Sequence, residues 1–292
     1  MKGVKTMIIV SACLAGIPCN YNGEATPDER VISLIKEGLA FPVCPEILGG
    51  LTIPRSRTRI VESDGNTVLD SKKGLLTADG RDVTKQFLKG AELTLRVLRL
   101  LGIDTVIFKQ YSPSCGCGQT LGGLFEPARI KGDGVATALL KREGVKVYPE
   151  ESLADDKFFE SLRAKHSKNK KELVLISMCG LGIPCQYRAR SFSRKSFIAK
   201  LREKYTLYPL CPEQFGGMPT PRVACRLEKG RIIGKDGKDY TQPYQQGASI
   251  VLSFAKMAGI KRAYMKKGSP SCGVGGITRK MLEEAGIQVH LL

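Results

Sequence analysis

Short apolar runs alternate with amphipathic stretches along the first half of the chain. The runs predict buried strands, and the stretches between them have the three-to-four-residue period of helices. The predicted strands are Thr6–Val10, Ala40–Val43, Thr105–Phe108 and Val145–Tyr148, and the predicted helices are Glu29–Glu37, Asp82 to about Leu101, and Gly134–Arg142. Strands separated by helices of this length favour a mainly parallel sheet with helices on its faces.

The second half repeats this order. Its predicted strands are Leu173–Ile176, Leu207–Leu210, Arg262–Met265 and Gln288–Leu291, and its predicted helices are Arg194–Lys204, Gln242–Ala258 and Ile277–Ala285. Between the halves, Asp155–Lys165 predicts a connecting helix, and the polar stretch His166–Glu172 follows it. These patterns predict an α/β fold with two tandem Rossmann-like three-layer domains and mainly parallel sheets.

Three pairs of segments indicate that the halves are copies of one domain. Seven of eleven positions are identical between Ser11–Tyr21 and Ser177–Tyr187, seven of twelve between Cys44–Arg55 and Cys211–Arg222, and six of eight between Lys109–Gly116 and Lys266–Gly273. The segment from Thr120 to Asp133 is largely missing after Gly273, so the second copy is shorter. We therefore predict domains at 1–150 and 173–292, with a linker at 151–172.

Composition excludes some classes of protein and suggests a partner. The 292 residues are 42% hydrophobic and 25% charged, which is ordinary for a folded protein. No apolar run approaches the ~18 residues of a membrane helix. Lys and Arg total 46 against 28 Asp and Glu, a net charge of +18, which favours a polyanionic partner such as nucleic acid. A surplus that only aids solubility is the alternative.

The segment Val10–Cys13 resembles a lipoprotein cleavage box, but Met7–Val10 is shorter than the ~7–15 residues of an export signal's apolar core. A similar cysteine follows an apolar run in mid-chain at Ile176–Cys179, where an export signal has no reason to recur. Both segments are interpreted as strands that end in a cysteine loop. The expected location is the cytoplasm, where thiols stay reduced.

Ten cysteines accompany only two histidines and no tryptophan. Cys13, Cys44 and Cys115 each follow the carboxyl end of a predicted strand, and the second copy has Cys179, Cys211 and Cys272 at the matching positions. Ligands bind at this edge of open α/β sheets, so we expect each triplet to converge. No C-x-x-C pair supports a four-thiolate zinc site, and an iron–sulfur cluster with one open iron fits the separated cysteines better. Buried apolar cysteines remain the alternative.

Five motifs are similar to those of a known family. They are S-x-C-x-x-G-x-x-C-x-Y at Ser11–Tyr21, C-P-E-x-x-G-G-x-x-x-P-R at Cys44–Arg55, A-D-G-R-D-V-T at Ala78–Thr84, S-P-S-C-G at Ser112–Gly116 and G-D-G-V at Gly132–Val135. With these motifs the first half resembles the thiouracil desulfidase family. The resemblance implies an enzyme that removes sulfur from thiolated pyrimidines with a 4Fe-4S cluster on three cysteines. It also implies tRNA as a partner, because related members act on thiolated uridine in tRNA.

By the same resemblance, Cys13, Cys44 and Cys115 hold the cluster, and Glu46 and Ser112 are the catalytic side chains. The matching residues of the second copy are Cys179, Cys211, Cys272, Glu213 and Ser269. The complete cysteine triplet argues for a second cluster, whereas the missing segment, which we expect to help wall the pocket, argues against full activity there. Capping of a helix or turn is the ordinary alternative for the glutamates and serines. The sequence leaves the roles of Cys19, Cys117, Cys185 and Cys225 open, as well as the oligomeric state.

Charge divides unevenly between the copies. Residues 1–150 carry +4, residues 151–172 carry +1 and residues 173–292 carry +13. We therefore expect the first copy to react with the thiolated base and the second to bind the RNA. The candidate RNA-binding residues are Arg188, Arg190, Arg194, Lys195, Arg226, Lys229 and Arg231, with Tyr187 and Tyr244 as candidates for stacking on bases. A zinc- or cluster-bearing RNA-binding module without activity, and a persulfide sulfur carrier, are the alternative functions.

Overall fold

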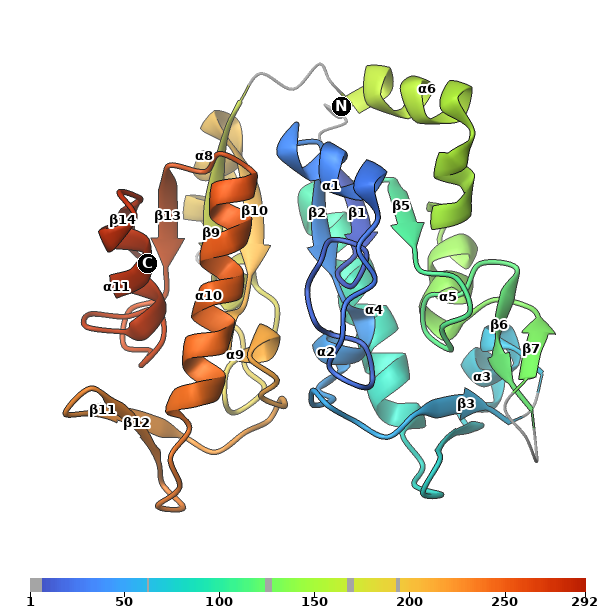
Figure 1. Ribbon diagram of the computed structural model, residues 1–292, viewed down its shortest axis with the longest axis horizontal. Helices are drawn as coiled ribbons and strands as arrows, with labels where there is room; N and C mark the ends of the chain where they lie inside the picture. Colours follow the sequence, from blue (N-terminus) through green and yellow to red (C-terminus); the bar gives the residue numbers. More distant parts are fainter. Residues whose placement is uncertain (1–6, 62, 124–127, 167–170, 193–194) are drawn as a thin grey trace. The chain divides into compact units, whose positions relative to one another are not determined.

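The computed structural model describes residues 7–61, 63–123, 128–166, 171–192 and 195–292 (Figure 1). Residues that lie close in space group into two compact units, residues 1–169 and 170–292, which we call unit 1 and unit 2. Among the described residues, no helix combines the length and the apolar character needed to cross a membrane.

The main sheet of unit 1 is parallel throughout, with strand order β2-β1-β5-β8. Its strands are β1 (Ile8–Ser11), β2 (Ala40–Val43), β5 (Thr105–Phe108) and β8 (Lys146–Pro149). The chain passes from β1 to β2 on one side and later returns to β5 on the other. The sheet therefore has a topological switch point between β1 and β5, where such folds place their ligands.

The helices of unit 1 begin and end at clear sequence signals. They are α1 (Glu29–Lys36), α2 (Pro45–Gly49), α3 (Gly65–Ser71), α4 (Thr84–Leu101), α5 (Val135–Arg142), η1 (Glu150–Ala154) and α6 (Asp156–His166). The Asp28 side chain caps α1 by accepting a hydrogen bond from the backbone N–H of Val31 at 3.0 Å. Gly102 ends α4 in the left-handed conformation at φ 72°, which glycine adopts without strain.

Unit 2 has the same architecture, so the α/β prediction with mainly parallel sheets in two similar halves is confirmed. Its sheet has the order β10-β9-β13-β14 and is also parallel throughout. The strands are β9 (Glu172–Ser177), β10 (Tyr205–Leu210), β13 (Arg262–Met265) and β14 (Gln288–Leu291). The helices are α7 (Met178–Leu181), α8 (Lys195–Lys204), α9 (Pro212–Phe215), α10 (Thr241–Met257) and α11 (Ile277–Glu284).

Each unit also carries smaller strands that the sequence did not predict. In unit 1, β3 (Thr58–Ile60), β4 (Leu75–Thr77), β6 (Gln119–Gly122) and β7 (Ala128–Lys131) form a sheet of order β4-β3-β6-β7. In unit 2, β11 (Cys225–Glu228) and β12 (Arg231–Gly234) form a hairpin. The segment that is missing from the second copy corresponds to β6 and β7, and the short turn at Lys229-Gly230 replaces α3.

The predicted connecting helix is α6, and it is held to unit 1. Arg30 of α1 pairs with Asp156 at 2.6 Å, and Arg163 of α6 pairs with Glu37 at 3.0 Å. The helix therefore belongs structurally to the first compact unit. The sequence-based bounds of 1–150, 151–172 and 173–292 remain a prediction.

Candidate active site

The carboxyl ends of three adjacent strands bring the predicted cysteines of unit 1 together. Cys13 follows β1, Cys44 follows β2 and Cys115 follows β5. All three line one cavity of about 50 Å³, with Cys19 in the same wall. The triplet expected from the sequence thus converges, and a fourth cysteine joins it.

Serine hydroxyls fix the loops that carry these cysteines. Ser11 at the end of β1 accepts a hydrogen bond from the backbone N–H of Lys109 at 2.9 Å, which ties β1 to the chain beyond β5. Ser112 accepts hydrogen bonds from the backbone N–H groups of Ser114 and Cys115, both at 3.1 Å. The turn that carries Cys115 is therefore closed by the same serine that the motif nominated for catalysis.

The C-P-E motif forms the start of a short helix. Cys44 is the N-cap of α2, and Pro45 occupies the first turn, where its missing N–H costs nothing. Behind the helix, a Cβ on Gly49 would stand 2.1 Å from the backbone oxygen of Gln86, and one on Gly90 would stand 2.1 Å from that of Pro45. These two glycines let α2 lie directly against α4, which places Glu46 beside the cysteines.

Glu46 lies between an arginine and a serine. Its Oε2 accepts a hydrogen bond from Arg55 Nε at 2.7 Å, and its Oε1 is 3.5 Å from the hydroxyl of Ser112. The side chains of Glu46 and Arg55 are only 12% and 8% exposed. The Arg55 Nη atoms also donate to the carbonyl oxygen of Cys19 at 3.2 and 3.1 Å. The carboxylate is thus held beside the thiols in a nearly closed site.

The thiols of unit 1 form a hydrogen-bonded group. Hydrogen bonds to Cys13 and Cys44, together with burial, raise the pKa of Cys19 well above its ordinary value. The hydrogen bond from Cys19 lowers the pKa of Cys44 despite burial, and the Arg55 charge lowers it further. Burial raises the pKa of Cys115, and the charge of Cys44 adds to this. Cys19 therefore lies within hydrogen-bond reach of both Cys13 and Cys44.

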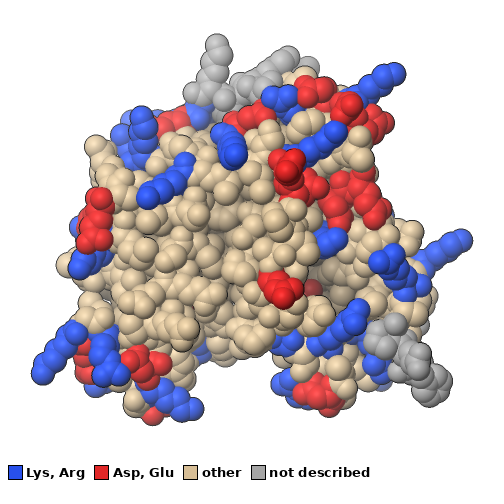
Figure 2. Space-filling view, in the orientation of Figure 1, with Lys and Arg blue, Asp and Glu red and all other residues tan. Residues whose placement is uncertain are grey.

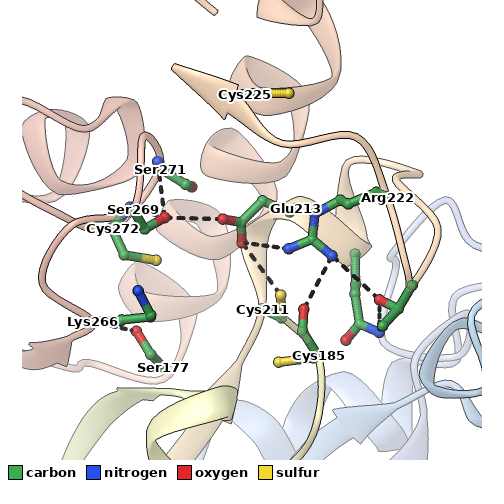
Figure 3. Close-up of polar contacts among 12 residues, drawn as sticks. Ser177, Cys185, Cys211, Glu213, Arg222, Cys225, Lys266, Ser269, Ser271 and Cys272 are labelled. Atoms are coloured by element: carbon green, nitrogen blue, oxygen red, sulfur yellow. Dashed lines mark hydrogen bonds and ion pairs between the residues drawn. The ribbon is translucent and has the colours of Figure 1, made fainter. Parts of the chain in front are cut away.

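Unit 2 repeats the arrangement. Cys179, Cys185, Cys211 and Cys272 line one cavity of about 260 Å³ together with Glu213. Figure 3 shows Glu213 between Ser269 on one side and Arg222 on the other, with Cys211 and Cys272 bordering the same space. The Ser269 hydroxyl donates to Glu213 Oε1 at 3.0 Å and accepts from the backbone N–H groups of Ser271 at 3.1 Å and Cys272 at 3.2 Å.

The thiols of unit 2 form the same kind of hydrogen-bonded group. Hydrogen bonds to Cys179 and Cys211, with burial, raise the pKa of Cys185 well above its ordinary value. The hydrogen bond from Cys185 lowers the pKa of Cys179 despite burial. Burial raises the pKa of Cys272, and the charge of Glu213 adds to it. A central thiol donor between two cysteines is therefore a shared property of both copies.

The remaining cysteines lie outside these groups. Cys117 is absent from the residues that line the first cavity, and its sulfur contacts the carbonyl oxygen of Val147 at 3.6 Å. Cys225 does line the second cavity, but it lies apart from Cys185, Cys211 and Cys272 (Figure 3). Cys225 hydrogen-bonds to Tyr244, and burial raises the pKa of the Cys225 thiol. Neither cysteine is placed with the converging triplets.

The donor sets fit an iron–sulfur cluster. Three thiols from separate loops meet in each cavity, and thiolates are the ligands that iron–sulfur clusters use. Within the part of the chain that the structure describes, no group of three or more His, Cys, Asp or Glu side chains is arranged to hold one metal ion. A cluster spreads its ligands over several irons, so the converging sulfur donors are the relevant criterion.

The structure places most of the candidate RNA-binding residues at the surface of unit 2. Arg188, Arg190, Arg226, Lys229 and Arg231 are exposed, whereas Arg194 and the side chain of Lys195 lie outside the described residues. Figure 2 shows basic side chains mainly along the edges of the visible face, with mostly uncharged surface and some acidic side chains between them. No single basic patch stands out on the face in view.

Some of these candidates are held in ion pairs, and one of the two tyrosines is buried. Arg226 pairs with Glu228, and Arg231 Nε donates to Asp239 at 2.9 Å. Tyr187 is 40% exposed, with the Arg188 guanidinium 5.3 Å from its ring centre. Tyr244 is only 3% exposed and lines the cavity, so it is not available to stack on a base at the surface.

Two features of the site were missed at the sequence level. The arginine that ends the C-P-E motif, Arg55 or Arg222, contacts the glutamate in both units. The signal was present, since both copies keep Pro-Arg at this point. The second feature is the position of Cys19 and Cys185 among the other thiols of each cavity. The sequence leaves this position open, because it depends on how the loops fold.

The A-D-G-R-D-V-T motif has a structural role. Asp82 accepts a hydrogen bond from the backbone N–H of Thr84 at 2.8 Å at the start of α4. The Thr84 hydroxyl in turn accepts from the backbone N–H of Leu75 at 3.0 Å. In unit 2, Asp239 and Thr241 repeat the first contact at 2.8 Å. The motif joins a strand to the long helix that supports the site.

Comparisons with known proteins agree with the duplication. A family model described as 2-thiouracil desulfurase matches residues 8–152 and again residues 174–292. The uncharacterized protein YbbK of Bacillus subtilis (strain 168) is 42% identical over 149 residues, which is 51% of this chain and 99% of the relative. The solved structure of the 4Fe-4S-dependent thiouracil desulfidase TudS is 38% identical, with a TM-score of 0.47, and the match covers 54% of this chain and 99% of TudS.

Proposed function

The chain belongs to the 2-thiouracil desulfurase family, and from this premise we propose that it removes sulfur from a thiolated uracil or uridine with a 4Fe-4S cluster on Cys13, Cys44 and Cys115. The overall reaction replaces the thiocarbonyl by a carbonyl, consumes one water and releases hydrogen sulfide, so no external oxidant or reductant is needed. The observation that carries the proposal is the glutamate–serine contact beside converging cysteines, which recurs in both units.

Cys13, Cys44 and Cys115 would hold the cluster, which would supply a soft Lewis acid for the thione sulfur. Glu46 is placed to take a proton from the attacking water or to return one to the ring. The Ser112 hydroxyl accepts two backbone hydrogen bonds, so its own proton is free to point towards Glu46 and relay between the two. Burial of the carboxylate keeps bulk water away from this transfer.

We extend the proposal to the second copy, with a second cluster on Cys179, Cys211 and Cys272 and with Glu213 and Ser269 in the catalytic roles. The segment missing from this copy would argue against full activity there if it formed a wall of the site. However, the residues that line the first cavity include no described residue of β6 or β7, so the described part of this segment does not form its wall. The second cavity is also the larger of the two.

The proposed substrate is a thiolated uridine in tRNA, with the basic second copy binding the phosphates. Unpaired bases are the usual target of sequence-specific RNA recognition, and exposed Tyr187 with Arg188 beside it is suited to stacking. A stacked thiouridine would have to be turned out of its helix to reach the buried site, and phosphate contacts offset that cost. None of the ten cysteines, all of them described, is in a disulfide, which accords with the proposed cytoplasmic location.

The test is sulfide release by protein prepared without oxygen. Wild type should be brown, hold about four irons per occupied site and release sulfide from 2-thiouracil or thiolated tRNA. Glu46→Gln combined with Glu213→Gln should lower the rate by at least about 10²-fold with unchanged iron content, because general acid–base groups contribute on that order. Each single substitution then shows which unit turns over.

Three other results would contradict the proposal. Colourless protein with tightly bound zinc and no sulfide release would indicate the RNA-binding module. Labelled sulfur retained on a cysteine in iron-free protein would indicate a sulfur carrier. Turnover of free thiouracil with no detectable RNA binding at low salt would remove the tRNA part of the proposal and keep the rest.

A further inference from the structure

The glutamate of the site occupies two different arrangements in the two units. In unit 1, Glu46 Oε2 accepts from Arg55 Nε at 2.7 Å, and the Ser112 hydroxyl is 3.5 Å away from Oε1. In unit 2, the Ser269 hydroxyl donates to Glu213 at 3.0 Å, and the nearest arginine nitrogen, Arg222 Nη2, is 3.8 Å away. Glu213 Oε2 instead accepts a hydrogen bond from the Cys211 thiol at 3.3 Å. The closest partner of the carboxylate is thus the arginine in unit 1 and the serine in unit 2.

This difference leaves a buried donor at the wall of the second cavity. Among the described residues, Arg222 Nε has no hydrogen-bond partner, although the side chain is only 4% exposed. Arg222 lines the cavity together with Cys211 and Ser269 (Figure 3). A buried N–H without an acceptor is costly, so this donor is suited to a ligand that brings the acceptor.

The Nη1 group of each guanidinium is held by the backbone. Arg222 Nη1 donates to the carbonyl oxygens of Cys185 at 3.0 Å and Pro219 at 3.3 Å. Arg55 Nη1 donates in the same way to Cys19 and Thr52, both at 3.2 Å. The Nη2 group donates to the carbonyl oxygen of Cys19 in unit 1 at 3.1 Å and faces Glu213 at 3.8 Å in unit 2. The Nε group donates to the glutamate in unit 1 and has no described partner in unit 2. This Nε donor matches a single acceptor atom.

We propose that Arg55 and Arg222 bind the substrate, each donating its Nε hydrogen to the exocyclic carbonyl oxygen that a monothiolated uracil retains. The proposal rests on the proposed function and adds a binding residue to it. The oxygen replaces the glutamate on the arginine, and the freed carboxylate moves to the serine hydroxyl. The glutamate of unit 1 has the arginine-bound position that precedes this exchange, and the glutamate of unit 2 has the serine-bound position that follows it. Binding of the substrate oxygen to the arginine is thereby coupled to formation of the hydrogen bond between the serine and Glu46 or Glu213.

The chemistry of the two ends of the substrate supports this orientation. The thione sulfur is soft and is directed to the thiolate-lined end of the cavity, where Cys211 and Cys272 lie. The carbonyl oxygen is the harder acceptor and is suited to a charged N–H donor. A site built to satisfy a substrate oxygen also rejects analogues that lack it, because its buried donor is then left unpaired.

The experiment compares 2-thiouracil with pyrimidine-2-thione, which keeps the thione but has no exocyclic oxygen. Wild-type kcat/KM, from sulfide release without oxygen, should favour 2-thiouracil by roughly 10- to 100-fold, the value of a charge-assisted hydrogen bond. The double variant Arg55→Gln/Arg222→Gln should lose this preference by falling on 2-thiouracil and staying nearly constant on pyrimidine-2-thione. Each single variant reports the unit that it changes.

Matched controls are Arg99→Gln in unit 1 and Arg279→Gln in unit 2, which remove ion pairs to Glu143 and Glu283 away from the cavities and should keep the preference. Equal losses on both substrates in the double variant would overturn the proposal. If the arginine variants lose iron, the test is the wild-type ratio of kcat/KM on 2-thiouracil to kcat/KM on pyrimidine-2-thione. A ratio near one overturns the proposal. Wild type without sulfide release from either compound would instead overturn the proposed function.

Discussion

Cys19 and Cys185 raise the question of which cysteines hold iron. Each lies within hydrogen-bond reach of two neighbouring thiols in its cavity, so its position alone does not distinguish a ligand from a donor. We predict that Cys19→Ala combined with Cys185→Ala keeps about four irons per site, whereas Cys13→Ala combined with Cys179→Ala loses them. Iron analysis and the visible spectrum measure this.

Cys117→Ala is the matched control, because its sulfur contacts the carbonyl oxygen of Val147 and it is not among the cavity-lining residues. Iron lost to the same extent in the Cys19/Cys185 variant as in the Cys13/Cys179 variant would make the central thiols ligands. In that case the three-cysteine assignment would be wrong.

Asp239 links the stability of unit 2 to pH. Hydrogen bonds from Thr241, and then the Arg231 charge, lower its pKa to about 2. The pKa is lower in the folded state than in the unfolded chain, so the stabilisation is complete above the unfolded value near 3.9 and is lost as pH falls through about 2. We predict that Asp239→Ala lowers the melting temperature most above pH 5 and progressively less as the pH approaches 2.

Thermal unfolding followed at pH 2 to 7 measures this prediction. Glu203→Ala, an exposed change on α8, is the control and should leave the difference between pH 2 and pH 7 unchanged. A deficit of Asp239→Ala that stays the same across the whole range would show that the charge of the carboxylate is not involved.

At the scale of elements, close helix packing sets the position of the glutamates. The pair Gly49 and Gly90 joins α2 to α4, and the pair Gly216 and Gly247 joins α9 to α10, where an added Cβ would stand 2.0 and 1.9 Å from backbone oxygens of Pro243 and Pro212. An ordinary Gly→Ala change in a helix stabilises by about 1 kcal/mol. Here the neighbouring backbone has to move instead.

We predict that Gly90→Ala destabilises the protein by about 1–3 kcal/mol, the usual cost of overpacking, and lowers sulfide release by displacing Glu46. Denaturant unfolding and activity assays measure the two effects. Lys85→Ala, at an exposed position of the same helix, should change neither. A stabilised Gly90→Ala variant would show that α2 and α4 are not in backbone contact.

At the scale of the whole molecule, the excess of charge predicts salt-dependent binding of tRNA. Residues 173–292 carry +13, against +4 in residues 1–150. We predict that a variant with four cations changed to Glu binds tRNA more weakly; the four are Arg188, Arg190, Arg194 and Lys195. The slope of log K against log salt should fall by about 3, because each phosphate contact contributes roughly 0.7–0.9. Filter binding at several salt concentrations measures this.

A control variant changes four exposed cations of unit 1, Lys36, Lys73, Lys85 and Arg99, to Glu. It alters net charge by the same amount and should affect the slope much less. Equal effects of the two variants would show that tRNA senses the total charge of the protein rather than the surface of the second copy.

Local sequence determined the main sheets. Ala40–Val43, Thr105–Phe108, Arg262–Met265 and Gln288–Leu291 have the bounds that the sequence predicted. Polar residues flank Thr105–Phe108 and Arg262–Met265 on both sides, and a glycine lies two residues before each of the other two strands. The duplication and the motifs likewise identify the cysteines, Glu46 and Ser112 as candidates, because both are visible in the order of residues alone.

Only the tertiary structure decided the rest. The strands β3 and β6 are short and meet through Ile60 and Gly122, residues far apart in the chain, so neither has a local signal strong enough to reveal it. The contact of Arg55 with Glu46, the position of Cys19 between two thiols and the free Nε of Arg222 depend on distances between separate loops. Such distances arise when α2 packs against α4 and the strand ends align, and this packing involves residues that the sequence keeps apart.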